Sequence, residues 1–362
     1  MEEELASDIE QDLDVLDSLE PPSGIDFLQI IGYQGPYLPC WMRKQHNSSC
    51  LEAIMSKQTS PSQFLWLIEL SLELLPNLKS LQGLVELPSM KNLTLTGMPN
   101  LEELWITSCL ETGQGEEGVQ YCFPMLTNLA VKLCPKLYVK PYLPPCLEKL
   151  TVERSNENLL SSSSLFSCPL KPDVDKSSPS CCVLGVVPCL KELRLDGLTV
   201  SSSVWEVLQH FSELELLGIH GCPDMRQLPT SIGSLTSLRQ LQITRCSSLC
   251  MLPEGLQHLT SIQHLELAEC DALTMMPEWI GQLSVLQSLR ISECPALESL
   301  PQSIKCLTAL QELFIFGCRG LTKRYEEEVG DDRNLISHIP SVRIVDLELL
   351  ARRLGACTSV NP

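Results

Sequence analysis

The sequence predicts an α/β solenoid, in which short parallel strands line a concave face and short turns or helices form the convex face. Two observations predict this fold. One cysteine recurs every 24 residues, and columns of leucine and isoleucine keep the same interval. One such unit cannot bury its own apolar face, whereas stacked units bury it together. The cysteine column consists of Cys222, Cys246, Cys270, Cys294 and Cys318.

The first half of each unit is expected to be a strand. In "LQI" or "LEL" two side chains turn to one face and the middle one points away. The unit LxxLxLxxCxxLxxLP is that of a leucine-rich repeat, whose strands form the inner side of a horseshoe. The frame continues upstream into "CLKELRLDGL", where Leu198 occupies the cysteine position. The predicted core columns include Leu217, Leu241, Leu265, Leu289 and Leu313, and also Ile219, Ile243, Leu267, Ile291 and Ile315.

The second half of each unit is expected to return along the convex side. Proline lacks a backbone donor and disfavours continuation of a strand. Pairs three residues apart, such as Ile232 and Leu235, suit a single helical turn. The prolines that mark this half are Pro229, Pro253, Pro277 and Pro301.

Upstream of Leu190 the same LxxLxL core recurs with uneven spacing, in "LWLIELSLELLPNL", "MKNLTLTGMPNLEELWITSC", "MLTNLAVKLCPKL" and "CLEKLTVERS". Two segments, Glu111 to Gln120 and Ser155 to Cys182, are rich in Gly and Glu or in Ser and Pro, and we expect loops or insertions there. The predicted organisation is an acidic flexible leader at 1–20, irregular repeats at 21–155, a Ser/Pro-rich insertion at 156–185, regular 24-residue repeats at 186–325, and a C-terminal cap and tail at 326–362.

Composition restricts the function. The chain has 362 residues, of which 44% are hydrophobic, so it can bury a large core. Its formal charge is -19, which opposes binding to nucleic acid and to anionic membranes. The start of the chain lacks a signal peptide, and no run of about 18 apolar residues follows. We therefore expect a cytoplasmic protein with reduced thiols.

Motifs for catalysis are missing from the sequence. A P-loop, HExxH, GxSxG, a kinase catalytic loop, an EF-hand and CxxC pairs do not occur, so we expect no enzyme, no bound nucleotide or other cofactor, and no small-molecule substrate. His258 and His264 lack metal-binding spacing. The cysteine column could serve redox chemistry or zinc, or it could place a small buried residue where each strand bends. The second interpretation is favoured because Leu198 shares the column.

Several phrases give the chain a family resemblance: "GIDFLQIIGYQGPYLPCWM", "GMPNLEELW", "LCPKL", "LPPCLEKLTV" and "SHIPSVRIV". They resemble the leucine-rich repeat region of plant intracellular disease-resistance proteins of the coiled-coil, nucleotide-binding, leucine-rich repeat type. The resemblance implies a role in defence, with a protein partner that is a pathogen effector, a guarded host protein or a nucleotide-binding domain. The sequence shows no nucleotide-binding switch, which leaves three interpretations open: a truncated receptor, a gene fragment or a partial gene model.

Two other classes of function remain open. A leucine-rich adaptor, such as a ubiquitin-ligase substrate receptor, would need an F-box-like helical segment, and the first sixty residues do not have the sequence of one. An enzyme built on loops would need a catalytic constellation, which the sequence does not contain. A non-enzymatic recognition module with a protein-binding concave face is the favoured hypothesis.

Strand alternation selects the candidate binding residues. If Leu313 and Ile315 point into the core, Phe314 and Phe316 must face the concave surface. Two alternatives stay open: the segment from Ile339 to Val345 could cover these phenylalanines as a cap, and neighbouring charges in the columns could simply pair with one another. The predicted protein-binding residues are Phe314, Phe316, Arg290, Glu266, Arg245, Glu269, Glu293 and Arg239.

Overall fold

The computed structural model describes residues 14–43, 65–81, 84, 87–105, 107–111, 117–121, 123–140, 143–144, 146–160, 190–198, 205, 207–325 and 332–345. The chain divides into two compact units, Met1–Leu190 (unit 1) and Lys191–Pro362 (unit 2). Each unit carries parallel strands with leucine side chains turned into a core, which is the fold of a leucine-rich repeat solenoid. No helix among the described residues is long and apolar enough to cross a membrane.

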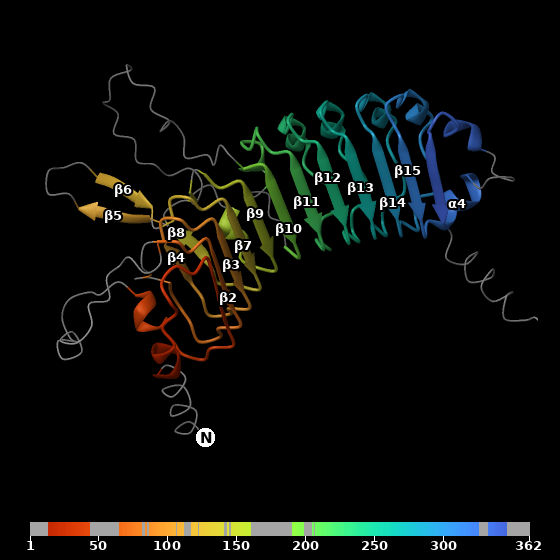
Figure 1. Cartoon of the computed structure of the whole chain (residues 1–362). Helices are drawn as coiled ribbons and strands as arrows, with labels where there is room; N and C mark the ends of the chain where they lie inside the picture. Colours follow the sequence, from red (N-terminus) through yellow and green to blue (C-terminus); the bar gives the residue numbers. More distant parts are fainter. Residues whose placement is uncertain are drawn as a thin grey trace, which may run out of the picture. The chain divides into compact units, whose positions relative to one another are not determined.

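Unit 2 contains the regular repeats, whose strands lie side by side in chain order (Figure 1). Each strand pairs in parallel with the next so that residues 24 apart are aligned, as in Leu241↔Leu265. Alternate residues are buried, and Leu241 and Leu289 are fully enclosed. The strands are β10 (Glu192–Asp196), β11 (Leu216–His220), β12 (Gln240–Thr244), β13 (His264–Ala268), β14 (Ser288–Ser292), β15 (Glu312–Phe316) and β16 (Ser341–Val345).

The convex returns of unit 2 are single turns of 3₁₀ helix. Each begins directly after one of the four prolines, whose extended backbone turns the chain out of the core. In the last of these turns the backbone N–H of Leu307 donates to the carbonyl of Ile304 at 3.2 Å. The turns are η3 (Thr230–Ser234), η4 (Glu254–His258), η5 (Glu278–Gln282) and η6 (Gln302–Cys306), as the sequence predicted.

The C-terminal part of unit 2 adds a strand to the sheet. After α4 (Arg319–Tyr325) and η7 (Arg333–Leu335), strand β16 pairs in parallel with β15, and Arg343 lies beside Phe314. Tyr325 is fully buried, and its hydroxyl accepts a hydrogen bond from the backbone N–H of Leu300 at 3.1 Å. The expected cap of Ile339 to Val345 therefore extends the sheet at its edge and leaves the phenylalanines half-exposed.

Unit 1 has the same strand pattern with uneven spacing. Aligned leucines on neighbouring strands are between 21 and 42 residues apart. The four predicted irregular repeats each provide one strand of the main sheet, and Leu93 and Leu129 are buried in them. The strands are β1 (Phe27–Ile31), β2 (Glu69–Glu73), β3 (Asn92–Thr96), β7 (Asn128–Lys132) and β9 (Lys149–Glu153), and η1 (Cys40–Met42) follows β1.

Two segments of unit 1 that were expected to be loops or insertions contain regular secondary structure. The segment from Glu111 to Gln120 includes the end of β5 (Thr107–Glu111) and most of β6 (Glu117–Tyr121), which form an antiparallel hairpin. The Gly and Glu content concealed the strand that ends in "VQY". The segment from Ser155 begins with η2 (Glu157–Leu160), and its remainder, 161–182, lies outside the described residues. A second small sheet pairs β4 (Glu103–Trp105) with β8 (Tyr138–Lys140).

The side chains of the cysteine column form hydrogen bonds with backbone groups at the ends of the strands. The thiol of Cys318 lies 3.4 Å from the carbonyl of Phe316 and 3.8 Å from that of Ile291, and its sulfur accepts the N–H of Cys294 at 3.3 Å. Each thiol lies against carbonyl oxygens, as expected for a small residue in a strand bend. We call this position the slot.

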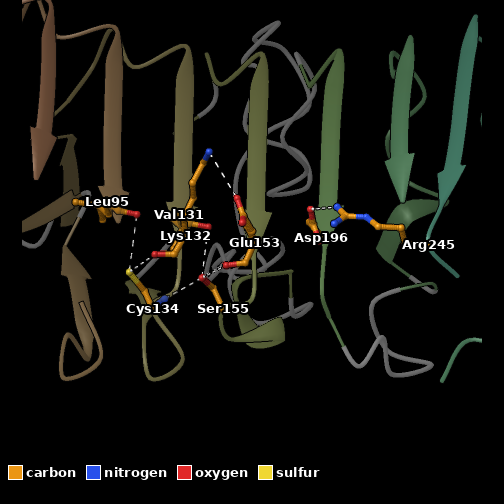
Figure 2. Close-up of polar contacts among 8 residues, drawn as sticks. All are labelled: Leu95, Val131, Lys132, Cys134, Glu153, Ser155, Asp196 and Arg245. Atoms are coloured by element: carbon orange, nitrogen blue, oxygen red, sulfur yellow. Dashed lines mark hydrogen bonds and ion pairs between the residues drawn. The ribbon is translucent and has the colours of Figure 1, made fainter. Parts of the chain in front are cut away.

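The slot also occurs in unit 1, where the sequence did not reveal it (Figure 2). The hydroxyl of Ser155 donates to the carbonyl of Glu153 at 2.8 Å and lies 3.4 Å from that of Val131. Its oxygen accepts the N–H of Cys134 at 3.0 Å. Ser155 therefore makes the same three contacts as Cys318. Cys134 and Ser155 do not fall in the 24-residue column, because the repeats of unit 1 are unevenly spaced.

Candidate protein-binding surface

The concave face of unit 2 is formed by residues that alternate with the buried leucines. The middle residue of each strand defines the central row, and the residue after each strand defines the end row. All six end-row residues from β10 to β15 have positive φ, between 50° and 65°. The central row is Arg194, Gly218, Gln242, Glu266, Arg290, Phe314 and Arg343. The end row is Gly197, Gly221, Arg245, Glu269, Glu293 and Gly317.

From β10 to β13 the polar side chains bond to one another. Arg194 Nε lies 2.7 Å from Glu192 Oε1, and its Nη1 donates to Gln242 Oε1 at 3.3 Å. Gln242 Nε2 in turn donates to Glu266 Oε2 at 3.0 Å. The arginine crosses β11 at Gly218, where a Cβ would lie 2.7 Å from His220 Nε2 and in ordinary contact with Arg194 Cγ at 3.5 Å. This part of the face is internally satisfied.

A second contact crosses β11 at the end row. Arg245 Nη2 lies 3.1 Å from Asp196 Oδ2 (Figure 2), so Arg245 pairs two strands away and not with the neighbouring Glu269 that the sequence suggested. Gly221 stands between them, and a Cβ there would lie 2.9 Å from Asp196 Oδ1. Close by, His220 Nδ1 lies 2.6 Å from Thr244 Oγ1. The pKa of His220 is lowered, mainly by burial, and the lower pKa favours the neutral form of the imidazole.

From β14 to β16 the face is aromatic. The rings of Phe314 and Phe316 are stacked with centroids 6.3 Å apart and planes 5° apart, and both side chains are half-exposed. The guanidinium of Arg290 lies 5.9 Å from the Phe314 ring centroid and 3.3 Å from Glu312 Oε2. This ion pair is largely exposed and contributes about 0 to 1 kcal/mol. Arg343 is exposed on the other side of Phe314.

The end row next to this aromatic pair is acidic. A depression of about 450 Å³ is lined by Glu269, Asp271 and Glu293, together with Arg245, Ser247, Pro295 and Gly317. Among the described residues none of the three acidic side chains forms an ion pair. Glu269 and Glu293 have φ of 52° and 50°, a conformation that costs an L-residue about 1 to 2 kcal/mol. Glycine, which occupies the same position after β15, would avoid that strain.

Two family models match the chain. Residues 195–335 match the model described as "Leucine-rich repeat region". Residues 2–98 match the model described as "R13L1/DRL21 LRRs", a family of plant resistance-protein repeats. The repeats are of the plant resistance-protein type. Repeat domains of this type are generally non-catalytic and bind proteins, which makes the chain a protein-interaction module.

Solved structures with similar repeats come from distant sources. A leucine-rich repeat protein of Leptospira interrogans is 21% identical with a TM-score of 0.39, and the match covers 49% of this chain and 41% of that one. An internalin of Listeria monocytogenes is 13% identical with a TM-score of 0.40, covering 94% and 86%. The mouse RP105/MD-1 complex gives 16% identity and a TM-score of 0.49, covering 88% and 52%. No curated protein matches the chain.

The predicted site residues all lie within the part matched by the general leucine-rich repeat model, and they fall into three groups. Phe314, Phe316, Arg290 and Glu266 lie on the concave strands, and Arg245, Glu269 and Glu293 lie in the end row. Arg239 lies just before β12, at the opposite strand ends, with its Nε 3.9 Å from Glu215 Oε2. It is therefore separate from the aromatic pair.

Sequence reasoning missed Arg343 and Asp196. Arg343 could have been found from the alternation in "SVRIV", which places it in the central row once the segment is taken as a strand. Within the described part of the chain, no group of three or more His, Cys, Asp or Glu side chains could hold a metal ion. The chemistry that the surface offers is apolar contact and ion pairing.

Proposed function

We propose that the chain is a cytoplasmic recognition module of plant immunity that senses a pathogen effector or a guarded host protein through the concave face of unit 2. The plant resistance-type repeats support the setting in defence. The acidic net charge of -19 disfavours nucleic acid as the partner.

One observation carries this proposal: the stacked, half-exposed pair of Phe314 and Phe316. Strand β16 lies beside β15, and both phenylalanine side chains stay half-exposed. Large aromatic side chains dominate the binding energy of protein interfaces because they bury much apolar area at little cost in conformational entropy. An aromatic pair on an otherwise polar face is therefore the best anchor that unit 2 offers.

The β10 to β13 part of the face supports this choice by contrast. Arg194, Gln242 and Glu266 already bond to one another, so a partner would have to replace these bonds to use them. Replacing satisfied polar contacts gains little, because each lost bond offsets the one formed. The partner is expected to contact this region at the periphery.

The test is the double variant Phe314→Ala and Phe316→Ala, measured against a panel of purified effectors and their host targets. We expect every bound partner to lose at least about tenfold in affinity, while the thermal midpoint of the chain stays unchanged. The matched control is Met251→Ala with Met275→Ala, which removes two apolar side chains that are 50% and 61% exposed outside the concave strands.

Three results would contradict the proposal. The first is a partner whose affinity is unaffected by the phenylalanine variant. The second is an equal loss of affinity in the methionine control, which would show nonspecific apolar binding. The third is a lower thermal midpoint with binding intact, which would assign the phenylalanines to packing.

A further inference from the structure

We propose that the aromatic pair and the acidic end row form one docking surface for a basic segment of a partner protein, in which an aliphatic or aromatic side chain has lysine or arginine on one side. This inference rests on the proposed function and specifies the chemistry of its partner. The surface consists of Phe314, Phe316, Glu269, Asp271 and Glu293.

The two parts of the surface are contiguous. Glu293 is the first residue after β14, and Phe316 is the last residue of β15. The backbone N–H of Glu293 donates to the carbonyl of Phe316 at 2.7 Å, so the two residues are direct neighbours. Gly317, the next residue along the chain, lines the acidic depression together with Glu293. A side chain resting on Phe316 therefore has the depression directly beside it.

The depression carries uncompensated negative charge. It is lined by three carboxylates and one guanidinium, and Arg245 is already paired with Asp196 at 3.1 Å. None of the three carboxylates has an ion-pair partner among the described residues. A lysine or arginine of the partner would supply the missing charge, and complementary potentials favour its approach and its orientation.

The opposite side of the aromatic pair limits the orientation of the partner. There Arg290 is paired with Glu312 at 3.3 Å, and Arg343 is exposed beside Phe314. A partner with basic residues on both sides of its apolar side chain would meet Arg343 as a like charge. The basic residues are therefore expected on the side of the partner segment that faces Glu269 and Glu293.

The test uses a library of short random peptides displayed on phage and selected on the full chain. We expect enriched peptides to combine an aromatic or aliphatic residue with lysine or arginine a few positions away. Synthetic copies are then measured by fluorescence polarisation against two test variants and one control. Glu269→Lys with Glu293→Lys, and separately Phe316→Ser, should each weaken binding by about tenfold or more.

The matched control is Glu213→Lys with Glu254→Lys, which makes the same change in net charge at two exposed positions outside the surface. It should leave peptide affinity within about twofold. An equal loss in this control would overturn the proposal, because it would show nonspecific attraction to an acidic protein. Enrichment of acidic peptides that depend on Arg343, or of no peptide that depends on Phe316, would overturn it as well.

The two proposals fail in different ways. If a protein partner depends on the phenylalanines but not on Glu269 and Glu293, the proposed function stands and the basic segment is wrong. If basic peptides bind as described while no effector or host target does, the surface chemistry stands and the role in sensing is wrong.

Discussion

Unit 1 and unit 2 build the same strands from very different repeat lengths. In β3 and β7 of unit 1, and in β12 and β15 of unit 2, buried and half-buried residues alternate in the same order. The repeat length is constant at 24 from β10 to β15 and varies from 21 to 42 in unit 1. The local LxL pattern therefore determines where a strand forms, while the length of the return changes only the connection between neighbouring strands.

The two units differ at the end row. In unit 1 it includes the charged Arg154 and also two leucines, Leu74 and Leu133, which are 54% and 43% exposed, and all three residues have positive φ. In unit 2 the corresponding non-glycine residues are charged. Both units thus place strained side chains at the strand ends, where backbone geometry favours glycine. Core positions are alike in the two units, whereas end-row positions have diverged.

The largest expected effect concerns the reactivity of the slot cysteines, and it tests whether their thiols are equally protected from solvent in both units. Hydrogen bonding with Cys270, followed by burial, raises the pKa of Cys294 to about 12, and burial raises the pKa of Cys134 to about 11. Because the thiolate is the reactive form, both should be alkylated at least about a hundredfold more slowly at pH 8 than the exposed Cys250 and Cys306, and Cys294 the more slowly of the two. Mass spectrometry after timed alkylation measures this directly.

Denaturant provides the control, since all four thiols should then react at similar rates. Rapid labelling of native Cys134 with Cys294 still protected would show that only unit 2 has a closed slot. A disulfide between Cys246 and Cys270 under reducing conditions would contradict the free, buried thiols of the structure.

The next effect concerns the core columns. Leu265 in unit 2 and Leu129 in unit 1 are each 2% exposed, so Leu265→Ala and Leu129→Ala should each open a cavity and cost about 2 to 5 kcal/mol. Urea unfolding followed by circular dichroism measures the change. A loss confined to Leu265→Ala would break the comparison, because it would show that uneven spacing loosens the core of unit 1.

Much of this fold is predictable because the core obeys short-range rules. Alternation locates β12 to β15, and a proline followed by residues such as Ile232 locates the convex turns. The hairpin of β5 and β6 was missed because it lies between repeats, where no column constrains it. Cys134 and Ser155 were missed because a fixed 24-residue interval cannot find a slot that follows a return of another length.

The candidate site was less predictable than the fold because its pairings depend on three-dimensional reach. Phe314 and Phe316 follow from alternation alone. The pairing of Arg245 with Asp196 does not, since the arginine extends over Gly221 to a strand two positions away. Arg343 depends on β16 lying beside β15, whereas the sequence suggested this segment only as a cap over the phenylalanines.

A smaller effect is expected at the slot itself. Ser155→Ala and Cys318→Ala each remove the acceptor of a backbone N–H, at Cys134 and at Cys294 respectively, and should cost about 1 to 3 kcal/mol. Ser155→Cys and Cys318→Ser keep the contacts and should cost less than the alanine variants. Urea unfolding measures all four. Alanine variants as stable as the conservative ones would mean that the slot contacts contribute nothing.

The smallest effect concerns the end row, where the sign of the change is the test. Glu293→Gly and Leu133→Gly relieve a left-handed backbone that costs about 1 to 2 kcal/mol, and the added flexibility of glycine offsets about 0.5 to 1 of this. Both variants should therefore gain up to about 1 kcal/mol in unfolding free energy. Gly317→Ala, at φ of 64°, is the control and should lose stability. If Glu293→Gly destabilises while Leu133→Gly stabilises, Glu293 makes a favourable folded-state interaction, and its carboxylate would not be free for a partner.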